Sequence, residues 1–141
     1  MLLRDLVAVD VTLPEQAGAI DIKGLTADSR AVEAGFLFAA VPGSTTDGSR
    51  FVGDAVSRGA VAVLAGPDAV LDMAADIPVL RSDDPRRTLS LMAARFYPWQ
   101  PSHLVAVTGT AGKTSVAAFF REICADAGHE AASMGTIGVA S

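Results

Sequence analysis

Short apolar runs alternate along this chain with segments in which apolar residues recur at helical spacing. Such alternation is typical of an α/β fold, in which helices connect the strands of a sheet and cover its faces. The sequence therefore predicts an α/β protein. The expected strands are 36–41 (FLFAAV), 60–65 (AVAVLA), 77–80 (IPVL) and 104–108 (LVAVT), with a weaker one near 20–25.

The first expected helix covers residues 47–59. Phe51, Ala55 and Val56 fall on one face of that helix, as the apolar face of a surface helix requires. Gly59 suits the position just after its end, because glycine readily adopts the left-handed conformation that closes many helices.

A second helix is expected to start at Asp84-Pro85 and to end near Tyr97. Aspartate can cap a helix, and proline fits the first turn, where its missing N–H has no partner to lose. Pro98 disfavours a helical conformation at the residue before it. The expected inner face carries Leu89, Met92, Ala93 and Phe96.

The sequence Tyr97-Pro-Trp-Gln-Pro-Ser102 is the expected domain boundary, because two prolines in four residues make a stiff connector. We predict one domain over residues 1–100 and the start of a second over 102–141. The second stretch reads as a single βαβ unit of about 40 residues, which buries little surface alone. We therefore expect the polypeptide to be the front part of a longer protein.

A third helix is expected from Gly112 to Ala127, with Gly128 as its cap and a further strand beginning within 131–134. Its apolar residues share one face, which predicts a buried stripe. That stripe is Val116, Phe119, Phe120, Ile123 and Ala127.

The composition and net charge limit the classes of ligand that the protein is expected to bind. The chain has 141 residues, of which 50% are hydrophobic, and a formal net charge of −5. Enough apolar material is present for a packed core, and the acidic balance argues against a nucleic-acid surface, which would normally be basic. A phosphate ligand stays compatible, because a few backbone N–H groups and one lysine can hold phosphates on an acidic protein.

The sequence contains few features that indicate a cellular compartment. Cys124 is the one cysteine, so no internal disulfide can form, and we expect it to be a small core residue. No signal peptide and no membrane-spanning apolar run is recognisable, so the expectation is a cytoplasmic protein with no membrane partner.

The residues that best fit a binding site lie in the stretch LVAVTGTAGKTSVAAFF, residues 104–120. Glycines let a backbone approach phosphates closely, a helix N-terminus offers unpaired N–H donors, and a lysine neutralises the terminal phosphates. A Ser or Thr hydroxyl there can bind Mg²⁺. These parts are Gly109, Gly112, Lys113, Thr114 and Ser115.

The match to the common phosphate-loop pattern is shortened, because Val107 stands where that pattern has its first glycine. The alternative interpretation is a tight strand-to-helix turn with an exposed lysine. The apolar run before the loop and the amphipathic helix after it favour the phosphate cradle.

Several segments together resemble the Mur ligase family. The short loop Thr108-Gly-Thr-Ala-Gly-Lys-Thr-Ser115 is similar to the loop of these enzymes, and residues 28–43 resemble the signature of their N-terminal domains. Asp47-Gly48 and Gly59–Leu64 match segments that follow this signature. Thr110 and the sequence Met134-Gly-Thr-Ile-Gly138 resemble the MurE type. The resemblance covers the whole chain but only the opening third or so of a full ligase.

The resemblance implies a fold and a set of sites. Residues 1–100 resemble the domain that binds the UDP end of the substrate, and residues from 102 resemble the beginning of a central P-loop ATPase domain. The implied contacts to the UDP-substrate are Ala27, Ser29, Ser44, Thr45 and Thr46. The implied ATP contacts are Gly109, Thr110, Ala111, Gly112, Lys113, Thr114 and Ser115, with Lys113 as the catalytic cation and Thr114 on Mg²⁺.

The implied activity of the whole protein is ATP-dependent amide formation in peptidoglycan synthesis. A diamino acid would be added to UDP-MurNAc-L-Ala-D-Glu, with the substrate carboxylate first phosphorylated by ATP. Ala111 departs from the asparagine usual in MurE loops, which removes a side-chain contact but leaves the backbone cradle. We expect no complete turnover from this chain alone, since the family's central and C-terminal machinery would lie beyond Ser141, and exposed strand edges favour self-association.

Other interpretations stay open. A MurF-type ligase is one, although the 134–138 segment argues against it, and a UDP-sugar-binding module with a vestigial phosphate loop is another. A small unrelated P-loop kinase would need a complete nucleotide domain. The alternative interpretation of Ser29 is a turn residue, and that of the segment 44–46 is a plain connector. Arg30 could approach phosphate or pair with Asp28 or Glu33.

Overall fold

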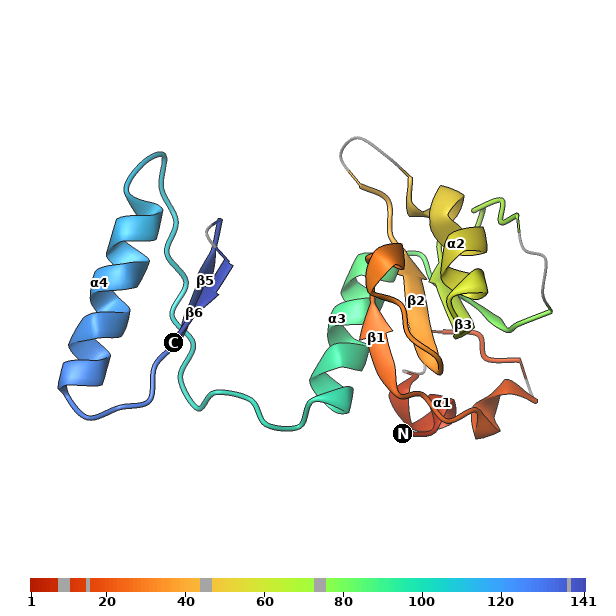
Figure 1. Cartoon of the computed structure of the whole chain (residues 1–141), viewed down its shortest axis with the longest axis horizontal. Helices are drawn as coiled ribbons and strands as arrows, with labels where there is room; N and C mark the ends of the chain where they lie inside the picture. Colours follow the sequence, from red (N-terminus) through yellow and green to blue (C-terminus); the bar gives the residue numbers. More distant parts are fainter. Residues whose placement is uncertain (8–10, 15, 44–46, 73–75, 137) are drawn as a thin grey trace. The chain divides into compact units, whose positions relative to one another are not determined.

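Residues 1–7, 11–14, 16–43, 47–72, 76–136 and 138–141 are described by the computed structural model of the chain. These residues form two compact units, Met1–Gln100 (unit 1) and Pro101–Ser141 (unit 2), both drawn in Figure 1. The division falls between Gln100 and Pro101, inside the connector that contains two prolines.

Unit 1 is built on a parallel four-stranded sheet. Its strands are β1 (Gly24–Thr26), β2 (Phe36–Ala40), β3 (Ala60–Ala65) and β4 (Val79–Arg81), paired in the order β1-β2-β3-β4. Every pairing in this sheet is parallel. The predicted α/β class with its strands at 36–41 and 60–65 is therefore confirmed, whereas β1 and β4 begin two or more residues later than expected.

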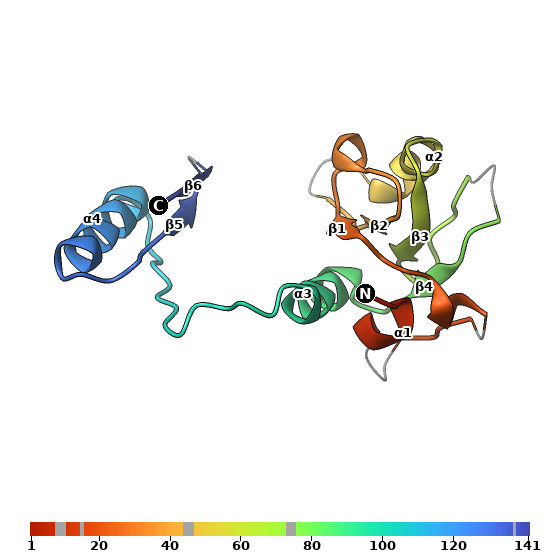
Figure 2. The same ribbon diagram turned by 60° about the horizontal axis from the view of Figure 1, so that its bottom comes forward.

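Helices lie on both faces of this sheet. They are α1 (Leu3–Leu6), α2 (Val52–Ser57) and α3 (Pro85–Phe96), and short 3-10 turns cover Ala17–Ala19, Ser29–Ala31 and Gly48–Phe51. Figure 2 shows α2 on one side of the strands and α1 with α3 on the other. The helix expected over 47–59 is thus a 3-10 turn followed by the short α2.

The start of α3 follows the sequence signal closely. The Asp84 carboxylate accepts a hydrogen bond from the Arg87 N–H at 2.9 Å, and Pro85 occupies the first helical position. This cap satisfies one of the N–H groups that a helix start leaves without a partner. The helix ends at Phe96, immediately before Tyr97, as expected from Pro98.

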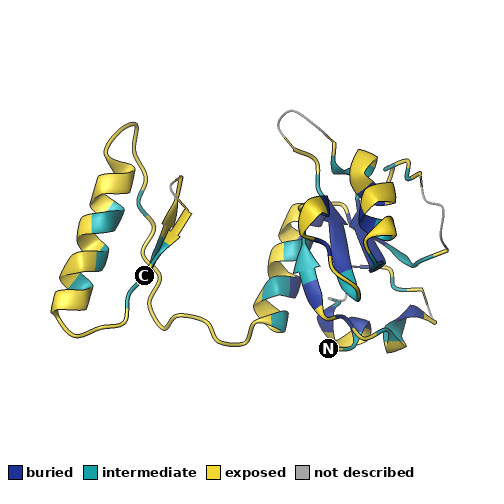
Figure 3. Ribbon diagram, in the orientation of Figure 1, coloured by how far each residue is buried: buried dark blue, intermediate teal, exposed yellow. Residues whose placement is uncertain are grey.

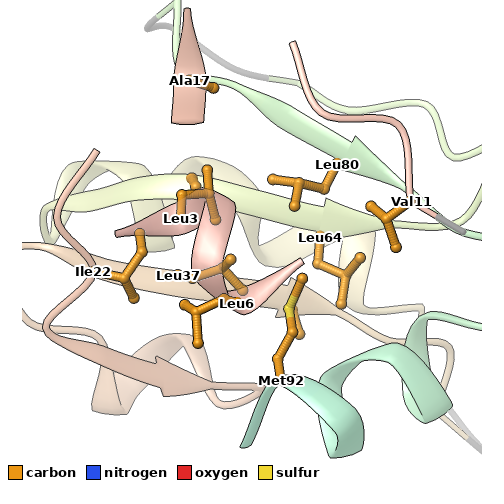
Figure 4. Packing of buried hydrophobic residues seen from close by; sticks show 11 residues of the cluster. Leu3, Leu6, Val11, Ala17, Ile22, Leu37, Leu64, Leu80 and Met92 are labelled. Carbon is orange, nitrogen blue, oxygen red and sulfur yellow. The ribbon is translucent and has the colours of Figure 1, made fainter. Parts of the chain in front are cut away.

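The core has two layers because residues of a strand alternate between the faces of the sheet. Leu37, Ala39 and Leu64 point into a cluster closed by α1 and by Met92 of α3, as Figure 4 shows for Leu37, Leu64 and Met92. Phe38 and Ala40 point the other way, into a cluster that includes Val52 and Ala55 of α2. A parallel sheet covered on both faces reads as the continuous apolar runs seen in the sequence.

A bulge adjusts the register between the two central strands. Phe36 pairs with Ala60, but the next residue, Leu37, pairs with Ala62, so Val61 is an extra residue in β3. This insertion explains why Ala60 and Val63 both face the α2 side, although they are three positions apart.

The N-terminal segment covers the free edge of β4. Thr12 forms an isolated antiparallel bridge with Arg81, and Leu3, Leu6 and Val11 are buried in the cluster on the α3 side. The Arg81 guanidinium also donates hydrogen bonds to the carbonyl oxygens of Gly66 and Ala69, both at 2.8 Å.

Unit 2 consists of α4 (Lys113–Asp126) and the antiparallel pair β5 (Ser133–Gly135) and β6 (Gly138–Ala140). Gly128 follows α4 with a φ of 84°, as its predicted capping role requires. The strand expected from 131–134 is β5, but its partner is the antiparallel β6 and not a parallel neighbour.

The prediction that the apolar stripe of α4 is buried is wrong. Val116, Phe119, Phe120 and Ile123 are 52%, 62%, 46% and 66% exposed, and Figure 3 shows α4 largely in the colour of exposed residues. A stripe is buried only where another element packs on it, and in unit 2 the helix α4 contacts β5. The half-buried residues of the helix lie on a different side and are Ala117, Ala118, Arg121 and Cys124.

The expected strand 104–108 is also absent from the described residues of unit 2. Leu104 and Val105 are 88% and 57% exposed, and the segment has no paired neighbour there. A strand is defined by hydrogen bonds to a partner, so an apolar run of strand-like composition without a partner stays an extended segment.

The two-layer core of unit 1 predicts that substitutions at neighbouring positions of α3 differ in their effect on stability. Met92 is 1% exposed, whereas its neighbour Leu91 is 37% exposed. Met92→Ala should lower the free energy of unfolding by about 2–5 kcal/mol, because it leaves a cavity against β2 and β3. Leu91→Ala, the control, should change it by about 0.5 kcal/mol or less. Urea denaturation of both variants measures the difference, and equal losses would contradict the two-layer core.

Candidate functional site

The glycine loop before α4 contains two glycines with positive φ. Gly112 is the N-cap of α4 with a left-handed φ of 75°, and Gly109 has a φ of 149°. No side chain caps the first turn of the helix. The N–H groups at this helix start therefore stay available to an anion, and the helix dipole adds a partial positive charge there.

Lys113 closes the loop. Its ammonium group donates a hydrogen bond to the carbonyl oxygen of Gly109, four residues earlier in the chain. This contact places the one charged side chain of the loop over the same turn that presents the free N–H groups. A compact cation beside uncapped N–H donors is the arrangement that favours a terminal phosphate.

The remaining loop residues are accessible. Thr110, Ala111, Thr114 and Ser115 are all exposed, so their backbone and hydroxyl groups can reach a ligand without rearrangement of a core. Thr114 and Ser115 lie in the first turn of α4, where a hydroxyl can contact an ion held by the loop. The loop thus brings together all seven residues predicted for ATP, on one turn and one helix start.

A second candidate region lies at the carboxyl ends of the parallel strands of unit 1, where ligands of open α/β sheets usually bind. Ala27 follows β1 directly and is exposed. Ser29 begins the next 3-10 turn. The predicted contacts Ser44, Thr45 and Thr46 lie outside the described residues, between Gly43 and Asp47, in the connection that follows β2.

Ser29 is not freely accessible. It is 7% exposed, and its turn packs against α2. On α2, the pKa of Asp54 is lowered, first by the hydrogen bond from Arg58 and next by the nearby Ser29 side chain. In this structure Ser29 is buried where the turn after β1 packs against α2, and its contact with a substrate stays a prediction.

Arg30 is engaged by its neighbour. Its guanidinium donates two hydrogen bonds to the Asp28 carboxylate, at 2.9 and 2.7 Å, and its backbone N–H donates a third at 3.0 Å. The Arg30 side chain lowers the pKa of Asp28 to about 2, and the backbone bond contributes next. Of the two roles open to Arg30, the structure shows the pairing with Asp28.

Sequence reasoning missed the long-range support of the β2 connection. Arg86, in the first turn of α3, donates a hydrogen bond from Nη2 to the carbonyl oxygen of Pro42 at 2.8 Å. Pro42 also forms an isolated bridge with Asp47. The sequence marks Arg86 only as a charged residue after a helix cap, and no local pattern reports a partner 44 residues away.

The other polar candidates have structural roles. Ser82 and Thr88 are buried and share a hydrogen bond at 2.7 Å between their hydroxyl oxygens, beside a shallow hollow that Asp83 and Arg87 also line. Asp84 caps α3 as predicted. Within the described ranges, no group of three or more His, Cys, Asp or Glu side chains is arranged to hold a metal ion.

None of the helices that the structure describes is both long and apolar enough to cross a lipid bilayer.

Comparison with known proteins identifies the family. Residues 21–97 match the sequence pattern described as "Mur ligase family, catalytic domain". The matched stretch is more than half of the chain and lies wholly in unit 1. The chain belongs to the Mur ligase family.

Its curated relatives agree on one type. A UDP-N-acetylmuramoyl-L-alanyl-D-glutamate–2,6-diaminopimelate ligase of Brucella melitensis is 53% identical over 100% of this chain and 29% of its own length. Proteins of the same name from Agrobacterium fabrum and Bradyrhizobium diazoefficiens are 57% and 48% identical over 90% and 100% of the chain. The chain spans about a quarter to 29% of these relatives' lengths. The resemblance to the MurE type is thereby confirmed.

A solved structure shows a related fold. The MurF ligase from Thermotoga maritima in complex with ADP matches 76% of this chain and 24% of its own chain, with a TM-score of 0.57 and 25% identity. MurF is thus a structural neighbour, while the higher sequence identities belong to MurE-type relatives. The alternative of a MurF-type chain is not favoured.

The Asp28–Arg30 pair gives a prediction about pH. Because the folded pKa of Asp28 is about 2 and its ordinary value is 3.8, the stabilisation from this pair is complete above pH 3.8 and is lost as the pH falls towards 2. In a carbon-13 NMR titration, Asp28 should have its midpoint near 2 in the unaltered chain. In Arg30→Ala it should move up towards 3.8.

Asp47 is the internal control for this titration. Its pKa is lowered by hydrogen bonds from Ser49, so Arg30→Ala should leave its midpoint in place. An unchanged Asp28 midpoint in the variant would show that Arg30 does not hold this carboxylate in solution.

Proposed function

We propose that this chain is the N-terminal part of an ATP-dependent ligase that adds a diamino acid to UDP-MurNAc-L-Ala-D-Glu during peptidoglycan synthesis. Unit 1 would bind the UDP end of the substrate, and unit 2 would begin the ATP-binding domain. The support is the family membership, the names of the relatives at 48–57% identity, and the loop 109–115.

The observation that carries the proposal is the loop itself. Gly112 caps α4 in a left-handed conformation without any side-chain cap, and Lys113 returns to the Gly109 carbonyl. A plain strand-to-helix turn has no need of uncapped N–H donors and a cation held over them. A site for a nucleotide's phosphates needs both.

The residues fit ATP with Mg²⁺. ATP supplies the phosphoryl group that activates a carboxylate for amide formation. The backbone N–H groups of residues 109–115 would bind and orient the phosphates, and the Lys113 ammonium would stabilise negative charge on them. The Thr114 hydroxyl would be a ligand of Mg²⁺, and Ser115 would support the loop by a hydrogen bond.

The assignment of the substrate end rests on position. Ala27 and Ser29 follow β1, and Val41 and Pro42 follow β2, so both connections leave from the carboxyl edge of a parallel sheet. In the sequence, residues 44–46 come next after the second of these. Neighbouring parallel strands deliver their following loops to the same edge, which allows one ligand to contact both.

Lys113→Ala should weaken ATP binding about tenfold or more, because it removes the charged partner of the terminal phosphates. Isothermal titration calorimetry of the 141-residue chain with Mg–ATP measures this change. Lys23→Ala is the matched control, since Lys23 is the other lysine of the sequence and lies in unit 1.

Equal ATP affinity in the unaltered chain and in Lys113→Ala would remove the role given to Lys113. If the chain then still bound UDP-MurNAc-L-Ala-D-Glu, the result would favour a UDP-sugar-binding module with a vestigial phosphate loop.

A further inference from the structure

The chain enters and leaves the connection after β2 through a short stem, made of Val41, Pro42, Asp47 and Gly48. Pro42 and Asp47 form an antiparallel bridge, so the two sides of the stem lie against each other. The Asp47 carboxylate accepts a hydrogen bond from the Ser49 N–H at 3.0 Å, which ties the returning side to the following 3-10 turn.

Gly48 shows how closely the two sides approach. A Cβ atom at this position would lie 2.8 Å from the Val41 carbonyl oxygen and 2.9 Å from the Val41 nitrogen. Both atoms belong to the backbone and cannot move aside as a flexible side chain would. The stem therefore has one packing arrangement, and it needs glycine on its returning side.

Arg86 connects this stem to a different part of unit 1. Its Nη2 donates to the Pro42 carbonyl oxygen at 2.8 Å, across 44 residues of sequence. Arg86 follows the buried Pro85 in the first turn of α3, the turn that Asp84 caps. The donor is thus carried by an element that the core holds in place through Met92.

A hydrogen bond from a charged guanidinium to a carbonyl is stronger than one between neutral groups. The bond from Arg86 therefore restrains the Pro42 carbonyl. Pro42 lies two residues before Ser44, the first of the predicted substrate contacts in this connection. Fixing the Pro42 carbonyl sets the position and direction in which the chain leaves the sheet edge.

We propose that Arg86 is a positioning residue for the UDP-substrate, acting through the Pro42 carbonyl on the stem of the β2 connection. This inference rests on the proposed function, because the connection carries the residues predicted to contact the substrate. Arg86 itself need not touch the ligand. Its part is to hold the stem in the binding arrangement before the ligand arrives, which lowers the entropic cost of binding.

Arg87 offers a matched control. It is the next residue in the same helical turn, carries the same charge, and is exposed like Arg86. Its guanidinium has no hydrogen bond or ion pair with any residue that the structure describes. Arg86→Ala and Arg87→Ala therefore change net charge equally, and they differ in the contact with Pro42.

The first measurement is made on the 141-residue chain without ligand. In nitrogen-15 NMR spectra, Arg86→Ala should shift the amide signals of Gly43, Asp47 and Gly48, whereas Arg87→Ala should leave them in place. Unchanged stem signals in Arg86→Ala would overturn the proposal, whatever the ligand affinities are.

The second measurement is the affinity for UDP-MurNAc-L-Ala-D-Glu by calorimetry. Arg86→Ala should weaken binding about three- to tenfold, and Arg87→Ala by about twofold at most. Thermal unfolding should show that both variants fold, with a midpoint for Arg86→Ala slightly below that of Arg87→Ala, because only Arg86 loses a hydrogen bond. Equal affinities in the two variants would overturn the proposal.

Salt separates positioning from direct contact with a phosphate. If Arg86 bonds only to a neutral carbonyl, the ratio of affinities between the unaltered chain and Arg86→Ala should be the same at about 50 mM and about 500 mM salt. An exposed ion pair with a phosphate is screened by salt, so a ratio that falls towards one would overturn the positioning role in favour of direct contact.

The proposed function fails in a different way. No binding of UDP-MurNAc-L-Ala-D-Glu by the unaltered chain would overturn the substrate assignment of unit 1, and the substrate role of Arg86 with it. Binding by the unaltered chain with equal variants would leave the assignment standing and overturn the inference about Arg86 alone.

Discussion

Burial of both faces of one small parallel sheet is the constraint on which the rest of unit 1 depends. Leu37 and Phe38 are neighbours in β2, point to opposite faces, and are both fully buried. Because burial of apolar surface is the main driving force of folding, each face must be covered, by α1 and α3 on one side and α2 on the other. The chain reaches α2 from the carboxyl end of β2 and α3 from the carboxyl end of β4. Because all four strands are parallel, the residues that follow β1 and β2 leave the sheet at the same edge.

Local signals in the sequence predicted a large part of this arrangement. Asp84-Pro85 marks the start of α3 because a cap and a first-turn proline act within one turn of helix. Gly112 and Gly128 at the two ends of α4 were likewise predicted from local sequence, and both have positive φ. The apolar runs of β2 and β3 were equally readable, since both faces of these strands are buried.

The features that sequence reasoning missed depend on distant partners. The run 104–108 has the composition of a strand, yet it has no paired neighbour in the described part of unit 2, and the apolar side of α4 is exposed for the same reason. Ser29 was predicted as a substrate contact, with a turn residue as the alternative; it begins a turn, and packing against α2 buries it. The contact between Arg86 and Pro42 spans 44 residues, and neither residue type announces the other.

The N-terminal segment has a consequence for where this folding unit begins. The family pattern starts at residue 21, but Leu3, Leu6 and Val11 fill the cluster over the sheet, and Thr12 bridges to the outer strand. A protein shortened to residues 21–97 would expose apolar surface of this cluster and leave the edge of β4 unpaired. Both features promote aggregation. The folded unit therefore extends, on its N-terminal side, beyond the segment that the family pattern matches.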